Sequence, residues 1–92
     1  MQTQKTPLYL KAMTLRDKSD ITVVKEDIKK NMILIVRVTP LAQKDLEELR
    51  KVVEDLYSYT ESAGGDIARL GEERIVITPP SVKIWRGIYD LK

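Results

Sequence analysis

The sequence predicts a small α/β (α+β) two-layer sandwich, with a mixed sheet, two helices on one face and a dimeric assembly. Three patterns predict this class. The run from Met32 to Val36 is continuously apolar and largely β-branched, as in a central strand that is buried on both faces. Residues 43–63 have the spacing of a long amphipathic helix. Two short apolar segments flank Gly71-Glu72-Glu73, as in an antiparallel hairpin. The expected order is β-α-β-α-β-β, with room for one further strand.

The first strand is expected at 7–13, where apolar residues alternate with others. The residues that share one face of this half-buried strand are Leu8, Leu10 and Ala12. A short helix should follow, capped by Asp17 or Ser19 and ending near Asn31. Its apolar side carries Ile21, Val24 and Ile28. A strand, a crossover helix and the buried strand at 32–36 form a βαβ unit, which makes the two strands parallel.

The long helix follows Thr39-Pro40, since proline cannot donate to a strand ladder but suits the first turn of a helix. It is expected from about Gln43 to Ala63. Its apolar stripe consists of Leu46, Leu49, Val53, Leu56 and Ala63, with Val52 beside it. Gly64 and Gly65 end the helix, one of them in the left-handed conformation that the position after a helix favours.

The hairpin is expected from Asp66 to Ile77, with Ile67 and in part Leu70 directed inward. Pro79-Pro80 stops its second strand, and Val82–Trp85 is a candidate edge strand. Both helices should cover one face of the sheet. The other face should then be solvated or covered by another subunit.

The size of the chain favours a dimer. Its 92 residues make one domain with a marginal core, and the absence of cysteine excludes a disulfide. Three parts are expected: a polar leader at 1–6, a core domain at 7–86 and a C-terminal tail at 87–92. No apolar run reaches the roughly 18 residues of a membrane span, and no signal peptide precedes the domain. A cytoplasmic protein is therefore expected.

Composition argues against an enzyme. Histidine and cysteine are absent, which removes the commonest metal ligands, general base and nucleophile. No acidic cluster has loop-like spacing for a hard cation, so neither a metal nor a cofactor is expected. Lys+Arg 16 balance Asp+Glu 14, a net charge of +2 that is too even for a dedicated nucleic-acid-binding protein. The 33% charged content and the single asparagine, Asn31, fit a thermophile.

The region after the long helix holds the candidate functional residues. Gly64 and Gly65 form a helix stop, and a residue without a side chain also lets another chain approach the backbone closely. Arg69 and Ile75 lie on opposite arms of the hairpin. Taken alone, they are a surface arginine paired with an acidic residue of the turn and a core isoleucine.

The hairpin region resembles the SepF family of cell-division proteins. The resemblance rests above all on Gly-Gly-Asp-Ile-x-Arg-x-Gly at 64–71, followed by Ile-Val-Ile-Thr-Pro at 75–79. It also includes the opening strand and the helix before Ile33–Val36, so that it covers roughly Leu8 to Ile84. The archaeal branch of the family is especially similar.

The resemblance implies a non-enzymatic adaptor. SepF-like proteins are dimers that bind the short C-terminal tail of FtsZ, the tubulin-like division GTPase, and tether its filaments to the membrane. In the family the tail lies in a pocket at the dimer interface, formed partly by the last helix and this hairpin. The matching tail-binding positions are Arg69 and Ile75. The positions associated with self-assembly are Gly64 and Gly65, and the dimer contact is expected near Val53 and Tyr57.

Family members usually begin with an amphipathic membrane-binding helix. Before Pro7 the only apolar residue is Met1, so this sequence is expected to reach a membrane, at the division site, only through such a helix supplied elsewhere. The aromatic residues are either peptide-docking groups or anchors at core edges and the dimer contact. They are Trp85, Tyr9, Tyr57, Tyr59 and Tyr89.

A small dimeric nucleic-acid-binding protein is the alternative. Archaeal chromatin proteins of the Alba type resemble the chain in size and in strand-helix order. The basic residues that support this reading are Lys29, Lys30, Arg37, Arg69, Arg74, Lys83 and Arg86. Acidic residues interleave with them, whereas a nucleic-acid surface normally has one sign of charge.

Overall fold

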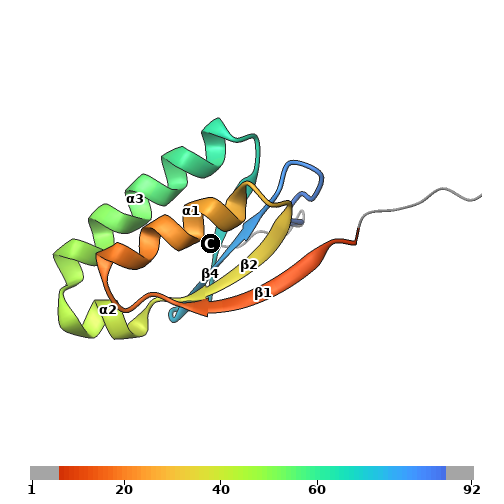
Figure 1. Ribbon diagram of the computed structural model, residues 1–92. Helices are drawn as coiled ribbons and strands as arrows, with labels where there is room; N and C mark the ends of the chain where they lie inside the picture. Colours follow the sequence, from red (N-terminus) through yellow and green to blue (C-terminus); the bar gives the residue numbers. More distant parts are fainter. Residues whose placement is uncertain (1–6, 87–92) are drawn as a thin grey trace, which may run out of the picture.

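The computed structural model describes residues 7–86, which form four strands, three α-helices and a short 3₁₀ turn (Figure 1). In chain order these are β1 (Tyr9–Thr14), the 3₁₀ turn η1 (Lys18–Asp20), α1 (Ile21–Ile28), β2 (Met32–Arg37), α2 (Thr39–Lys44), α3 (Leu46–Ser62), β3 (Asp66–Leu70) and β4 (Arg74–Thr78). The expected leader at 1–6 and tail at 87–92, with Tyr89, lie outside the described residues.

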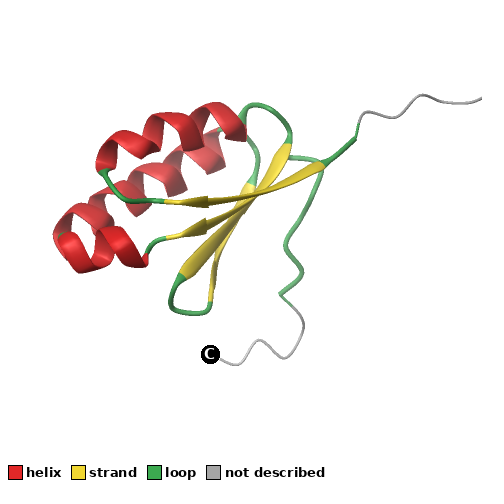
Figure 2. Cartoon of the chain, turned by 60° about the horizontal axis from the view of Figure 1, so that its bottom comes forward, coloured by secondary structure: helices red, strands yellow, loops and turns green. Residues whose placement is uncertain are grey.

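The four strands form one mixed sheet in the order β1-β2-β4-β3. β1 is parallel to β2, as the βαβ prediction required, and β4 is antiparallel to both of its neighbours. The helices all lie on one side of this sheet (Figures 1 and 2). The predicted two-layer arrangement with a mixed sheet is therefore confirmed. Within residues 7–86, β1 and β3 form the two edges.

The core lies between the helices and the sheet face that they cover, here called the covered face. Alternate residues of β2 and β4 point into it, because side chains alternate along a strand. These are Leu34, Val36, Ile75 and Ile77, none more than 5% exposed. From above, the helices contribute Val24, Ile28, Leu41, Leu49, Val52 and Leu56. Each such side chain contributes about 1.5–3 kcal/mol through removal from water.

The opposite face, here called the open face, is apolar although no described residue forms a helix over it. Its apolar side chains are Leu10, Ala12, Ile33, Ile35, Ala68, Leu70 and Val76, which share one face by strand register. Leu10 is 65% exposed, and Leu70, expected partly inward, is exposed as well. The central strand is thus buried on one face only, whereas its continuous apolar run predicted burial on both.

β1 presents the reverse of the expected side to the core. Its alternation was predicted correctly, but Leu10 and Ala12 lie on the open face, while Lys11 and Met13 take the covered face. The Lys11 ammonium reaches the Asp27 carboxylate of α1 at 2.6 Å, and Asp27 is only 2% exposed. This ion pair satisfies a charge that burial would otherwise make costly, and so it fixes the side that β1 turns to α1.

The helix boundaries differ from prediction at two places. The long helix starts early as α2, and Asp45 then interrupts it with an extended backbone (φ −162, ψ 99) before α3 begins. The reason is a cap: the Asp45 side chain accepts a hydrogen bond from the Glu48 N–H at 3.1 Å. Before α1, the short turn η1 intervenes: Asp17, one of the two expected caps, is the N-cap of η1, and the Asp20 carboxylate accepts from the backbone N–H groups of Arg16 and Asp17.

The ends of other elements agree with the sequence. Asn31 follows α1 with φ 62, in the left-handed region that asparagine tolerates, and so stops the helix as expected. The hairpin turn lies at residues 71–73, where Gly71 has φ 72. The segment Val82–Trp85, expected as an edge strand, is not a strand. Side chains rather than a backbone ladder hold it to the sheet.

Candidate functional site

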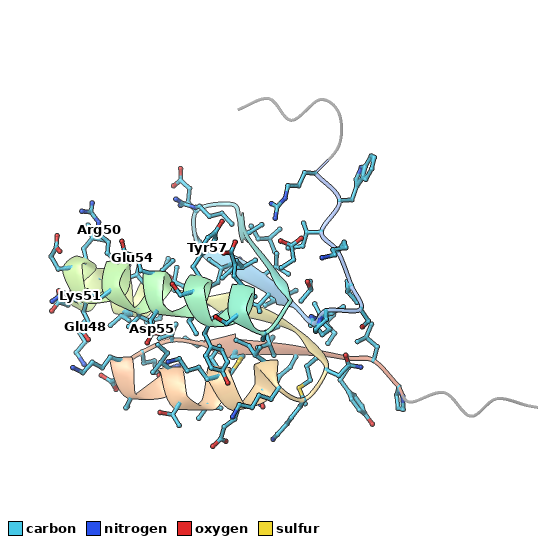
Figure 3. The ribbon with its side chains drawn as sticks, turned by 90° about the horizontal axis from the view of Figure 1, so that it is seen from above. Glu48, Arg50, Lys51, Glu54, Asp55 and Tyr57 are labelled. Carbon is cyan, nitrogen blue, oxygen red and sulfur yellow. The ribbon has the colours of Figure 1, made fainter. Side chains whose placement is uncertain are left out.

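α3 is the element that shapes the candidate site. Its core side carries Leu49, Val52 and Leu56, which lie at helical spacing and are buried. One flank faces α1, where the Lys25 ammonium lies 3.1 Å from the Asp55 carboxylate. Figure 3 shows Glu48 and Asp55 on this flank and Tyr57 on the other, toward the hairpin.

The flank of α3 toward β3 carries an apolar stripe of Leu46, Val53 and Tyr57, spaced by seven and four residues. Leu46 is 53% exposed and Tyr57 50%, whereas Val53 packs partly against the core. The sequence placed Leu46 in the buried stripe, but the break at Asp45 leaves it at the first turn of α3 in solvent. We call these three residues the α3 stripe.

The hairpin register brings the two predicted tail-binding residues together. Arg69 of β3 stands directly opposite Ile75 of β4, so both side chains lie on the covered face. Arg69 is exposed because β3 is the outer strand, while Ile75 is 5% exposed and belongs to the core. In a single chain, exposed apolar surface beside Arg69 therefore comes from α3, which packs over β3, and Ile75 supports it from below.

The two glycines have defined tasks within the chain. Gly64 has φ 84, and the hydrogen bonds from Gly64 N–H to the Glu61 carbonyl and from Gly65 N–H to the Thr60 carbonyl end α3 in a Schellman motif. A Cβ atom on Gly65 would lie 2.2 Å from the Thr78 carbonyl oxygen. The close approach that glycine permits here is thus to β4 of the same chain. Their role in self-assembly stays a prediction.

Asp66, which the sequence reading did not single out, organises the start of β3. Its carboxylate accepts hydrogen bonds from the N–H groups of Ile67 and Ile84, each at 3.0 Å, and from the Arg86 guanidinium at 2.8 Å. The bond from Ile84 is the main cause that lowers the pKa of the Asp66 carboxyl, while partial burial opposes it. No local spacing signals this cluster, because Arg86 follows twenty residues after Asp66.

Three of the seven basic residues of the nucleic-acid alternative have acidic partners. Lys30 lies 3.7 Å from Asp27, and Arg86 and Arg74 lie near Asp66 and Glu73. A hollow beside η1, α2 and α3 is also lined by both signs of charge, and its lysines pair with carboxylates there. Neither these basic residues nor the hollow forms a surface of one sign of charge, which binding to a phosphate backbone requires.

Among residues 7–86, no group of three acidic side chains lies close enough to hold a metal ion. Nor does this part of the chain contain a helix with the length and apolar character needed to cross a bilayer.

Comparisons with known proteins agree on one family. The family model described as "Cell division protein SepF" matches residues 10–84. A SepF-like protein from Pyrococcus furiosus has a TM-score of 0.81 and 28% identity, covering 90% of this chain and 100% of that chain. A SepF-like protein from Archaeoglobus fulgidus has a TM-score of 0.78 and 26% identity, covering 85% and 93%. A comparison with curated proteins finds no match.

A third solved structure is the cell division protein SepF from Methanobrevibacter smithii in complex with FtsZ-CTD. It shares the fold, with a TM-score of 0.75, 15% identity and coverage of 86% and 99%. The resemblance to archaeal members that the hairpin motif indicated is confirmed, and the heat-loving sources of the first two relatives accord with the charged composition. Because the family model spans most of the sequence, the chain belongs to the SepF family of cell-division proteins.

Proposed function

We propose that the chain is a non-enzymatic cell-division adaptor that binds the C-terminal tail of FtsZ as a homodimer. The observation that carries this proposal is the complex of a SepF protein of the same fold with FtsZ-CTD. Family membership and the position of Arg69 on the sheet face that α3 covers support it. The adaptor acts in the cytoplasm at the division site, where it helps to tether or organise FtsZ filaments at the membrane.

The chemistry of the site fits such a tail, which carries both apolar and acidic residues. Arg69 offers up to five fixed N–H donors to a carboxylate or to peptide carbonyls. Val53 and Tyr57 offer apolar surface on the flank of α3 toward β3. Ile75 lies in the core beneath this apolar surface and supports it.

The α3 stripe is also the proposed contact between two copies. Leu46 and Tyr57 are large and half exposed, and a small core gains most from burying such residues in a second subunit. In a dimer that joins two α3 helices, each Arg69 would lie near the contact between the subunits. The tail site would then be completed by both subunits.

Titration of the chain with a fluorescently labelled FtsZ tail peptide tests the function. Arg69→Ala should weaken the tail affinity about tenfold or more, as for a typical interface anchor, with an unchanged melting temperature. Ile75→Ala should weaken binding and also cost about 2–4 kcal/mol of stability, since a buried side chain is truncated.

The matched control is Arg16→Ala, which removes an exposed arginine just after β1, at the opposite edge of the sheet. It should bind the tail as the parent does. If Arg69→Ala and Arg16→Ala bind equally well, the site has been placed wrongly. A steeply salt-dependent shift of duplex DNA would instead favour the nucleic-acid alternative.

A further inference from the structure

The segment after β4 is fastened along the first part of β3. We call residues 79–86 the arm. It turns with a hydrogen bond from the Val82 N–H to the Pro79 carbonyl at 3.0 Å, and the Thr78 hydroxyl donates to the Val82 carbonyl at 2.8 Å. The Ile84 N–H then donates to Asp66 at 3.0 Å. The arm is thus held at its start and near its end.

Trp85 stands between two fastened residues of the arm. Before it, the Ile84 backbone is bonded to Asp66, and after it the Arg86 guanidinium bonds both the Asp66 carboxylate and the Ile67 carbonyl. Trp85 itself is 84% exposed, and it is the only tryptophan of the sequence. A large aromatic ring on a fixed backbone loses little entropy on binding, which is the usual property of an anchor for a partner.

The arm ends where a free stretch of strand edge begins. The outward N–H and carbonyl of Ile67 are bonded by Asp66 and Arg86. Residues two apart on a strand direct their backbone groups to the same side, so those of Arg69 also point outward, about 7 Å further along. Among residues 7–86, no neighbouring strand covers that side of Arg69. Because Ile84 and Arg86 are bonded at Asp66 and Ile67, the arm brings Trp85 to the end of this free stretch of edge.

We propose that Trp85 is a second anchor of the FtsZ tail site. This inference rests on the proposed function and extends it. The tail adds along β3 at Arg69, which binds its acidic or carbonyl groups, and seats an apolar side chain against the Trp85 ring. Asp66 and Arg86 are positioning residues that hold the ring in place.

The charge at this edge favours a peptide of opposite sign over a second copy of the chain. If two copies paired through their β3 edges, the two-fold axis would bring one Arg69 close to the other. Like charges that face each other across strands are unfavourable. An acidic and apolar tail meets the same groups with complementary chemistry.

The single tryptophan makes the test direct. Unlabelled tail peptide without tryptophan is titrated into the chain while the Trp85 emission is followed, and the affinity is measured in parallel by calorimetry. The emission should shift to shorter wavelength at saturation, because the ring leaves water. Trp85→Ala should lower the affinity about tenfold, whereas Lys83→Ala, on an exposed residue of the same arm, should leave it unchanged.

A separate measurement tests whether Arg86 acts by holding the arm, and with it Trp85, in place. Arg86→Ala should weaken tail binding less than Trp85→Ala does. In the double variant it should add nothing, because freeing the arm matters only through the ring. Trp85→Phe should recover part of the lost affinity. Full additivity of Arg86→Ala and Trp85→Ala would overturn the positioning role.

The outcomes separate this inference from the function on which it rests. If the parent and Trp85→Ala bind the tail equally and the emission does not move, the second anchor is wrong while the function stands. If Trp85 emission shifts with protein concentration and no peptide, the ring belongs to a contact between copies, and the proposal fails. A parent chain that binds no tail overturns both.

Discussion

The two faces of β2 carry similar apolar side chains but differ in how far these are buried. On β2, Leu34 and Val36 are fully buried, while their neighbours Ile33 and Ile35 are only half-buried. The side chains are equally apolar, so hydrophobicity alone does not decide burial. On this strand the helices decide it, because they pack over the face of Leu34 and Val36 and not over that of Ile33 and Ile35. An apolar face left without such cover is the usual mark of a surface that meets another molecule.

The largest expected effect is on stability at the covered face. Leu34→Ala should lower the free energy of unfolding by about 2–5 kcal/mol, through lost burial and a residual cavity. Ile35→Ala, one residue further on the same strand, should cost less than half as much. Chemical denaturation of both variants measures the difference. Equal losses would show that the open face is buried in solution.

The second prediction concerns the ion pair on the covered face between Lys11 of β1 and Asp27 of α1. Asp27→Ala leaves Lys11 without its partner, and we expect a loss of about 1–2 kcal/mol, less than for a fully buried pair because the lysine is partly exposed. Asp55→Ala, which breaks the exposed pair with Lys25, is the control and should cost under about 1 kcal/mol. Similar losses would mean that β1 does not depend on this pair for its orientation.

The third prediction asks which apolar surface joins two copies. Light scattering at micromolar concentration should give a dimer mass for the parent and a monomer mass for Val53→Asp on the α3 stripe. Ile35→Ser on the open face should remain a dimer with little change in folding. The reverse result would assign the contact to the open face, and a monomeric parent would exclude both.

The smallest expected effect is on the stability of the fold at acid pH. The bonds to Asp66, that from Ile84 above all, lower its pKa in the folded chain below the ordinary value of 3.8. The stability that this group contributes is therefore fully present above about pH 4 and is lost as the pH falls through the folded pKa. Asp66→Asn should flatten this acid dependence of the melting temperature, which thermal unfolding at a series of pH values measures. Identical acid profiles for the parent and Asp66→Asn would show that the bonds to Asp66 do not contribute to stability.

Much of the fold was readable from the sequence because its signals are local. The apolar strand at 32–36, the stop at Asn31, the turn at Gly71 and the helix end at Gly64 each depend on a few neighbouring residues. Alternation along β1 gave the two sets of side chains but not which set faces the core. That choice depends on Lys11 meeting Asp27, sixteen residues away.

The relative position of the two candidate residues was predictable for the same reason, while their role in binding stays a prediction. The hairpin turn is short, so Arg69 and Ile75 could be expected on adjacent strands, and their register places them side by side. The depth of Ile75 could not be read from one hairpin, because α3 determines it. Asp66 and the arm were missed, since the link from Asp66 to Arg86 follows no period and uses side chains in place of a ladder.

The strand order has a consequence for the way the chain is made. β4, the last strand, lies between β2 and β3 and is the only described partner of β3. During synthesis from the N-terminus, β1, α1 and β2 can assemble as soon as they leave the ribosome. β3 can pair only with β4, which is translated after it. Until β4 is present, the sheet beneath α3 is incomplete. A nascent chain halted before Arg74 would expose the outer strand of a half-built sheet, which is the state in which chaperones are most needed.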